Sequence, residues 1–244
     1  EIPIAALAFP EILNEIEKKY VTKIVLDFKI EQLQNIEDQI SSIQGEVLLF
    51  LPNIKSIVVI KDGLEVVNFQ KTADTISEVV INENKWNIFR SKELFYEGNV
   101  KFKYAIAWED DLQTNGMFYN YFPTDVATNL PCIIHATFDL TNNRKEINET
   151  NANKHILEEI VKSLGEIADQ RLKKANADWQ AYEFLTPTSK NNRKVLKDFY
   201  NQLEDIKETV NVYPTVDNQY LLKNEVVYHG EEFSAWVEEN GFEE

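Results

Sequence analysis

The sequence predicts an α+β fold in which a mixed sheet packs against helices. The middle of the chain, over residues 47–140, contains a series of short apolar or alternating segments that are typical of strands. Patterns with helical spacing lie mostly before and after this region. A strand-rich centre with helices at both ends is typical of α+β proteins, whereas a doubly wound sheet would alternate strands with helices.

The first residues predict a helix, a strand and a second helix. Apolar residues at helical spacing predict a helix over 9–20, with Pro10 in its first turn, where the missing N–H costs nothing. Alternating residues predict a strand over 21–28. The second helix is expected to end at Gly45. It is predicted from apolar residues three or four positions apart: Ile30, Leu33, Ile36, Ile40 and Ile43.

The strand-rich region begins at Val47 and includes a hairpin. Asp62-Gly63 lies between two apolar runs, and an Asp-Gly pair in that position strongly favours a tight β-turn. Residues 100–108 alternate strictly, which predicts a half-buried strand with Lys and Ala on its outer face. The remaining strands are predicted over 56–60, 64–70, 76–82, 86–90, 117–122 and 132–140.

The longest predicted helix covers residues 152–173. Its apolar residues form one continuous stripe, and Asn151 is the expected N-cap. An interruption of the helical pattern over 174–190 predicts a weak boundary there. The other elements predicted after this helix are helices over 177–185, 191–207 and 231–239 and short strands over 210–213 and 219–222.

The composition excludes several classes of protein. Hydrophobic residues make up 43% of the chain, which can fill a core and argues against intrinsic disorder. The net charge of −16 repels phosphates, so nucleic acid is not expected as the main partner. The single cysteine, Cys132, excludes an internal disulfide and a Cys-based zinc cluster. Three scattered histidines without paired spacing also argue against a metal site.

The chain is interpreted as a cytoplasmic piece of a longer protein. It begins at Glu1 rather than at Met. No apolar run reaches the ~18–20 residues needed to cross a bilayer, so no membrane partner is expected. The low cysteine content fits a reducing compartment.

A polar loop after the predicted strand 132–140 is the strongest candidate for a binding site. It contains Asn142, Asn143, Arg144 and Lys145 in succession. Amide side chains beside a guanidinium suit an anion, because the guanidinium is always charged and its N–H groups fit two phosphate oxygens. The alternative interpretation of these residues is a solvated turn.

This loop and the residues before it resemble a pattern of sacsin-like GHKL ATPases, which are related to the heat-shock protein 90 chaperones. The pattern has a Phe/Leu-Pro segment, then Thr-Gly-Leu-Pro, a strand with His and Phe-x-Leu, and Ser-x-Asn-Arg-Arg. Asn129 stands where Gly is usual, and Lys145 where a second Arg is common. The matching segments are Phe122-Pro123, Thr128-Asn129-Leu130-Pro131, His135, Phe138-Asp139-Leu140 and Asn142-Asn143-Arg144-Lys145.

Two flanking segments agree with this resemblance. Residues 45–57 are similar to the Leu-Leu-Phe-Leu segment that joins the ATPase domain to the middle domain in these proteins. Residues 212–227 are similar to a downstream Pro-x-Val-Asp-Gly-x-Tyr element. The three similar segments occur in the right order and cover most of residues 43–228.

The resemblance implies a middle (transducer) domain that lacks most of its ATP-binding domain. Residues 1–45 would be the end of the upstream ATPase domain and a connecting helix, and residues 46–175 the middle domain. Residues 176–244 would form a smaller helical and short-stranded appendage. The implied fold of the middle domain is a ribosomal-protein-like βαβ architecture.

The resemblance also implies a role for the polar loop. In these ATPases the middle domain sends a cation to the γ-phosphate, which implies that Arg144 makes this contact, with Lys145 as the alternative cation. Asn143 would orient the contact, and Asn143 and Lys145 are the implied nucleotide-binding residues beside it. The parent protein would use ATP and magnesium. This segment contains no Asp-x-Gly-x-Gly motif, Gly-rich lid or Glu-x-x-x-Asn helix, so alone it is predicted not to hydrolyse ATP.

Three functional hypotheses remain at this point. The first is the chaperone-like ATPase segment, whose partners would be its own upstream ATPase domain, a client protein and, as an open alternative, a second copy. The second is a nucleotide-independent protein-interaction module. The third is a segment of a DNA-linked ATPase, since the GHKL superfamily includes gyrase and mismatch-repair proteins, although the acidic charge counts against it.

Overall fold

The computed structural model describes residues 29–226 apart from 42, 62, 99, 113–115, 174–178, 212 and 216–218. The chain divides into two compact units, Glu1–Gln44 and Gly45–Glu244. The first contains the short η1 (Ile30–Gln32) and helix α1 (Leu33–Ser41). The helix predicted there is confirmed, although it ends before Gly45. The elements predicted over 9–20, 21–28 and 231–239 lie outside the described residues.

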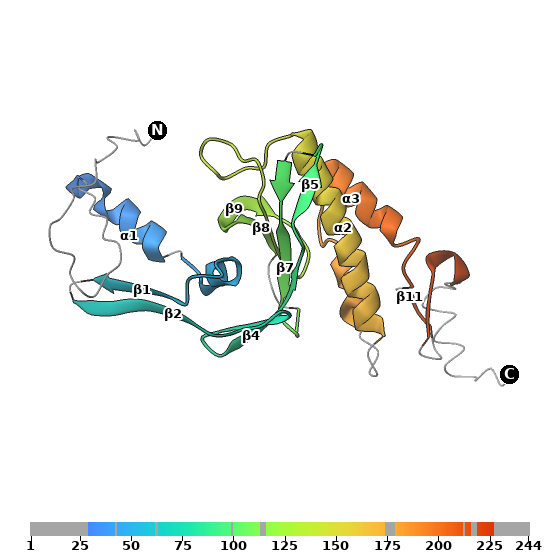
Figure 1. Ribbon diagram of the computed structural model, residues 1–244, viewed down its shortest axis with the longest axis horizontal. Coiled ribbons are helices and arrows are strands. Elements are labelled where there is room, and N and C mark those ends of the chain that lie inside the picture. The colour runs from blue at the N-terminus through green and yellow to red at the C-terminus, as the bar shows by residue number, and fades with distance from the viewer. Residues whose placement is uncertain are drawn as a thin grey trace. The chain divides into compact units, whose positions relative to one another are not determined.

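The second unit is built on a mixed eight-stranded sheet (Figure 1). The spatial order is β1-β2-β3-β4-β7-β10-β8-β9. Adjacent strands are antiparallel except for β8 and β10, which are parallel. The strands are β1 (Ser56–Lys61), β2 (Leu64–Asp74), β3 (Glu78–Ile81), β4 (Asn84–Arg90), β7 (Tyr104–Trp108), β8 (Met117–Asn120), β9 (Phe122–Ala127) and β10 (Ile133–Ala136).

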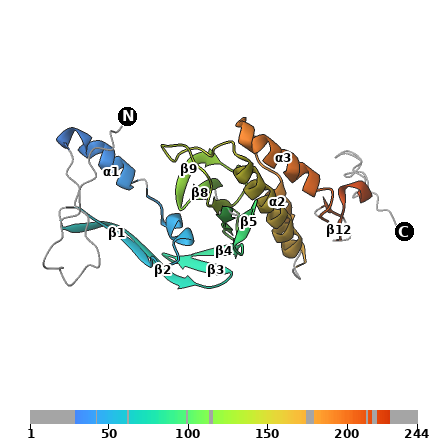
Figure 2. The same ribbon diagram turned by 45° about the horizontal axis from the view of Figure 1, so that its top comes forward.

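Helices cover this sheet, which confirms the predicted α+β class. Helices α2 (Asn151–Leu172) and α3 (Lys194–Ile206) lie side by side on one face of the sheet (Figures 1 and 2). The smaller elements are η2 (Gly45–Phe50), η3 (Trp179–Leu185), η4 (Lys223–Glu225), the strand pair β5 (Leu94–Tyr96) and β6 (Val100–Phe102), and the strand pair β11 (Tyr213–Pro214) and β12 (Tyr220–Leu221).

The predicted hairpin at Asp62-Gly63 is confirmed. Lys61 of β1 pairs with Leu64 of β2, which leaves two residues for the turn. Gly63 has a φ of +79°, a conformation that costs glycine little because it has no Cβ.

Several predictions near the sheet were wrong in part. The predicted strand 117–122 is divided at Tyr121 between β8 and β9, and the predicted strand 132–140 is shortened to β10. Residues 47–50 belong to η2 rather than to a strand, because a short apolar run fits a buried helical turn as well as a buried strand. The predicted strand 100–108 is divided at Lys103 into β6 and β7. In β7, Ala105 and Ala107 are buried, so the strand is covered on both faces rather than half-exposed.

Two hydrophobic layers account for this double coverage. On one face, the apolar stripe of α2 packs on strand residues such as Ile106 and Ile134, and η3 and α3 complete the same core. Residues on both sides of the predicted boundary near 175 therefore share one core. On the other face, η2 buries four consecutive apolar residues, each at most 5% exposed: Val47, Leu48, Leu49 and Phe50.

Candidate functional site

The predicted anion-binding loop is a closed turn that follows β10. Leu140 forms a β-bridge with Ile147, so the two ends of the loop lie together. The Thr141 N–H donates to the Glu146 carbonyl at 2.9 Å. The Arg144 N–H donates to the Thr141 carbonyl at 2.8 Å, which closes a four-residue turn inside the loop.

Side chains within the loop reinforce this turn. The Thr141 hydroxyl donates to Asn143 Oδ1 at 2.6 Å, and the Lys145 N–H donates to the same oxygen at 3.1 Å. The Glu146 N–H donates to Thr141 Oγ1 at 3.2 Å. The amide oxygen of Asn143 is therefore used to hold the loop in shape.

Arg144 occupies the tight part of the turn. Its φ is +60°, in the left-handed region, which costs a residue with a side chain roughly 1–2 kcal/mol. The residue is exposed, and within the described part of the chain its guanidinium makes no hydrogen bond or ion pair. The structure therefore presents an exposed cation, unpaired among the described residues, on a strained but well hydrogen-bonded turn.

Lys145 differs from Arg144 in its surroundings. Its Nζ lies 3.3 Å from Asp125 Oδ2, and its carbonyl accepts a hydrogen bond from the Asp125 N–H at 2.8 Å. Asp125 belongs to β9, so these contacts fasten the loop to the edge of the sheet. The charge of Lys145 already has a partner, whereas among the described residues that of Arg144 has none.

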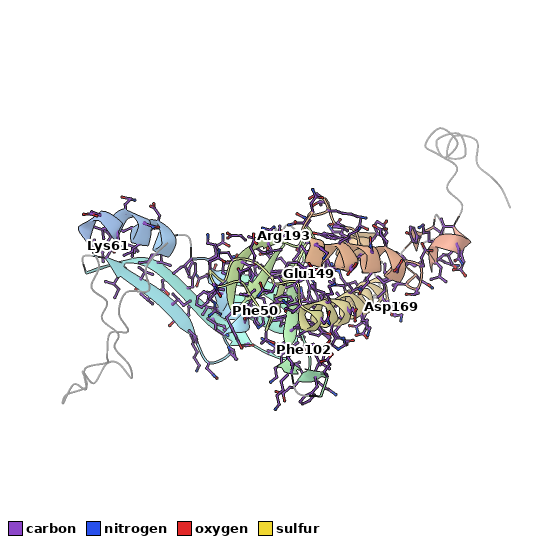
Figure 3. The ribbon with its side chains drawn as sticks, turned by 90° about the horizontal axis from the view of Figure 1, so that it is seen from above. Phe50, Lys61, Phe102, Glu149, Asp169 and Arg193 are labelled. Carbon is purple, nitrogen blue, oxygen red and sulfur yellow. The ribbon has the colours of Figure 1, made fainter. Side chains whose placement is uncertain are left out.

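Ion pairs also connect the loop region with the beginning of α3. Arg193 Nη2 lies 3.1 Å from Glu146 Oε1, and Lys194 Nζ lies 2.8 Å from Glu149 Oε1. Figure 3 shows Glu149 and Arg193 near the N-terminal ends of α2 and α3. Local sequence patterns could not identify these contacts, because Glu146 and Arg193 are 47 positions apart in the chain.

The turn before β10 contains Asn129, which stands where the sacsin-like pattern has Gly. Asn129 has a φ of +57°, and Gly and Asn are the residues that adopt this conformation most readily. Asn can therefore replace Gly at this position without disturbing the turn. The Asn129 carbonyl also accepts a hydrogen bond from the Thr188 N–H at 2.9 Å, which ties the turn to the segment before α3.

His135 is a buried residue of β10. Its ring stacks on Phe50 with the centroids 4.9 Å apart, and its Nδ1 accepts a hydrogen bond from the Tyr121 N–H at 3.1 Å. Burial lowers the pKa of His135 to about 4, so the ring is neutral near pH 7.

The other two histidines are not part of the sequence of the loop that carries Arg144. The ring of His155 packs against Tyr96 and Phe102, with centroid distances of 5.4 and 5.6 Å. His229 lies outside the described residues. Among the described residues, no cluster of three or more His, Cys, Asp or Glu is placed to hold a metal ion.

A groove of about 410 Å³ lies elsewhere, between α2 and the end of α3. It is lined by Gly165, Ile206 and Val210 and by charged residues of α2 such as Asp169. None of its lining residues belongs to the loop that carries Arg144.

Comparisons with known proteins gave no match, whether with family models, with curated proteins or with solved structures. The function is therefore argued from the sequence pattern and the geometry of the loop. Within the described residues, no helix is long and apolar enough to cross a membrane.

Proposed function

We propose that this chain is the middle segment of a sacsin-like GHKL ATPase and that Arg144 contacts the γ-phosphate of ATP bound by the upstream domain. The main support is the state of Arg144, which is exposed and unpaired within the described residues on a turn fixed by several hydrogen bonds. A cation that is already oriented stabilises charge with little reorganisation.

The fold around the loop supports this proposal at a coarse level. A strand, the loop and a long helix follow one another as β10, residues 140–147 and α2, which is the order that the family resemblance implies. The ribosomal-protein-like βαβ arrangement remains part of the proposal. Among the described strands, the one parallel pair is β8 and β10, and these are joined through β9 rather than through a helix.

The chemistry expected of Arg144 is electrostatic. ATP supplies the terminal phosphate that is transferred to water, and negative charge on its oxygens must be stabilised as the bond to it breaks. Arg144 would hold these oxygens through its N–H groups, while Asn143 shapes the turn. Arginine residues in such positions increase turnover by roughly 10³-fold or more.

Magnesium and most contacts to ATP would come from the upstream ATPase domain. The present chain would contribute Arg144 and couple the state of the nucleotide to a client or partner protein. A chaperone-like role in the cytoplasm belongs to the same proposal.

The test is ATP turnover by the chain extended upstream through the ATPase domain. We expect Arg144→Ala to lower kcat by roughly 10³-fold or more and to leave nucleotide binding unchanged. Lys145→Ala is the matched control, because this cation is already paired with Asp125. Its effect on kcat should stay below about tenfold. Undiminished turnover by the Arg144 variant would refute the assignment.

A protein-interaction module is the second candidate, and the β1–β2 hairpin favours it. Apolar side chains are exposed there, including Ile60 at 59% and Leu64 at 71%. Exposed apolar residues on a sheet edge are typical of protein-binding surfaces. Under this hypothesis, Arg144→Ala would leave every measured activity unchanged, whereas Ile60→Asp would abolish binding of the partner.

A further inference from the structure

Asn153, in the first turn of α2, is a fully buried polar side chain, with 0% of its surface exposed. A buried amide is stable only when its polar atoms have partners. Its Oδ1 accepts a hydrogen bond from the Asp139 N–H at 2.9 Å. Its Nδ2 donates to the carbonyls of Asp139 and Asn148, both at 2.8 Å. Both N–H groups and the amide oxygen are therefore used.

The partners of Asn153 lie at the two ends of the loop that carries Arg144. Asp139 precedes the β-bridge between Leu140 and Ile147, and Asn148 follows it. The Asn148 N–H also donates to the Asp139 carbonyl at 3.0 Å. The backbone thus closes the base of the loop, and the single side chain of Asn153 attaches both ends of that base to α2.

We propose that Asn153 is the positioning residue for Arg144: by pinning both ends of the loop to α2, it fixes the turn that presents the guanidinium. A left-handed conformation such as that of Arg144 persists only where the surrounding structure imposes it. The catalytic part of this inference rests on the proposed function. The structural part does not depend on it.

The exposed ion pairs of the loop cannot replace this buried attachment. Both partners of the Lys145–Asp125 pair are about 60% exposed, at 61% and 59%, and the Arg193–Glu146 pair is 33% and 52% exposed. Water and salt screen such pairs, so they contribute little to holding one conformation. The three hydrogen bonds of Asn153 are made by a side chain that water does not reach.

The structural part is tested by hydrogen exchange on the present chain. We expect Asn153→Ala to accelerate exchange of the hydrogen-bonded amides of Thr141, Arg144 and Glu146 by at least about tenfold. Asn153→Leu is a second variant that keeps the approximate size of the side chain but removes its donors and its acceptor. Leucine is favourable in helices and places no charge at this buried position, so this variant should remain folded.

Tyr104→Phe is the matched control for a general loss of stability. It removes a buried hydroxyl that donates to the Glu159 carbonyl at 3.1 Å, in α2 beyond the first turn that contains Asn153. The loop amides should keep their protection in this control. Unchanged loop protection in both Asn153 variants, or an equal loss of protection in Tyr104→Phe, would overturn the proposal.

The catalytic part is tested by a double-mutant cycle in the upstream-extended chain. We expect Asn153→Ala to lower kcat by about tenfold without changing KM for ATP, and to have no further effect in the Arg144→Ala background. An equal loss of kcat in both backgrounds would show that Asn153 does not act through Arg144. If Arg144→Ala leaves turnover unchanged, the proposed function fails, and the exchange experiment alone decides whether Asn153 fixes the loop.

Discussion

Asn129 and Arg144 are among the described non-glycine residues that adopt left-handed backbone conformations. Asn129 and Arg144 have φ values of +57° and +60°. Asn adopts this conformation readily, whereas Arg does so only at a cost in free energy. The positive φ therefore costs little free energy at Asn129. At Arg144 the cost is larger and must be offset by the hydrogen bonds of its loop.

Substitutions at Asn129 should separate backbone conformation from side-chain contacts. We expect Asn129→Gly to change the free energy of unfolding by less than about 0.5 kcal/mol, because Gly adopts positive φ freely. Asn129→Ala should destabilise the protein by ~1–2 kcal/mol, because its Cβ disfavours this conformation. Both variants lose the weak hydrogen bond from Nδ2 to the Tyr200 hydroxyl at 3.4 Å. Urea unfolding of the two variants gives the comparison, and equal losses would contradict it.

His135 should make the stability of the protein depend on pH. Burial lowers its folded pKa to about 4, below the ordinary value of 6.5, so the unfolded chain takes up a proton first as the pH falls. The stability due to neutral His135 is therefore complete above pH ~6.5 and is lost progressively towards pH ~4, by at most ~3 kcal/mol.

The measurement for His135 is the free energy of unfolding in urea between pH 7 and pH 4.5. His135→Phe keeps a ring against Phe50 but cannot take up a proton. We expect the stability of the wild type to fall more steeply with acid than that of the variant. Parallel curves for the two proteins would show that His135 does not contribute to the acid sensitivity.

At the scale of elements, α2 begins one residue earlier than predicted. Thr150 is the N-cap, and its hydroxyl accepts a hydrogen bond from the Asn153 N–H at 3.2 Å. The sequence contains Asn-Glu-Thr-Asn at this point, and Asn and Thr are both favourable caps, so the choice between them depends on the chain that enters the helix.

Removal of the two candidate caps should have unequal effects. We expect Thr150→Ala to lower the free energy of unfolding by about 1 kcal/mol, because one N–H of the first turn loses its partner. Asn151→Ala should change it by less than about 0.5 kcal/mol, since this residue is exposed and lies within the helix. Chemical unfolding of both variants tests this, and a larger loss at Asn151 would mean that the cap is misassigned.

Gly116, just before β8, packs closely against the turn that leads to β10. A Cβ added there would lie 2.1 Å from the Leu130 carbonyl oxygen and 2.5 Å from that of Cys132. Because backbone atoms cannot move aside easily, we expect Gly116→Ala to destabilise the protein by ~3 kcal/mol or more. Gly98→Ala is the control, since no atom lies within 4 Å of its added Cβ.

The comparison of these two glycines is made by thermal or urea unfolding. Gly98 has a φ of +75°, so its substitution should still cost roughly 1 kcal/mol through backbone strain. If the two alanine variants were equally stable, the close packing at Gly116 would not be a constraint on the fold.

The elements that the sequence predicted well are those defined by local patterns. Helix 152–173 and the hairpin at Asp62-Gly63 were found within one residue of their predicted positions, because periodicity and turn chemistry act over a few residues. The parallel pairing of β8 with β10 depends on contacts between distant segments, and no local pattern specifies it. For the same reason, the polar loop could be identified, but not its attachment through Asp125 and Asn153.

At the scale of the whole molecule, both hydrophobic layers lie in the second compact unit. The first layer is formed by α2, η3, α3 and the sheet, and the second by η2 on the other face. All the residues of these layers follow Gly45. The segment with the Leu-Leu-Phe-Leu pattern is therefore part of the core of this unit.

Two truncations should show where the folded unit begins. A chain that starts at Gly45 keeps both layers, so we expect it to unfold cooperatively in urea with a midpoint close to that of the full chain. A chain that starts at Leu51 loses the four buried residues of η2. At ~1.5–3 kcal/mol for each buried side chain, their removal is comparable to the whole stability of a domain. We expect this shorter chain to show no cooperative transition, whereas a cooperative transition in it would mean that η2 covers the sheet without stabilising it.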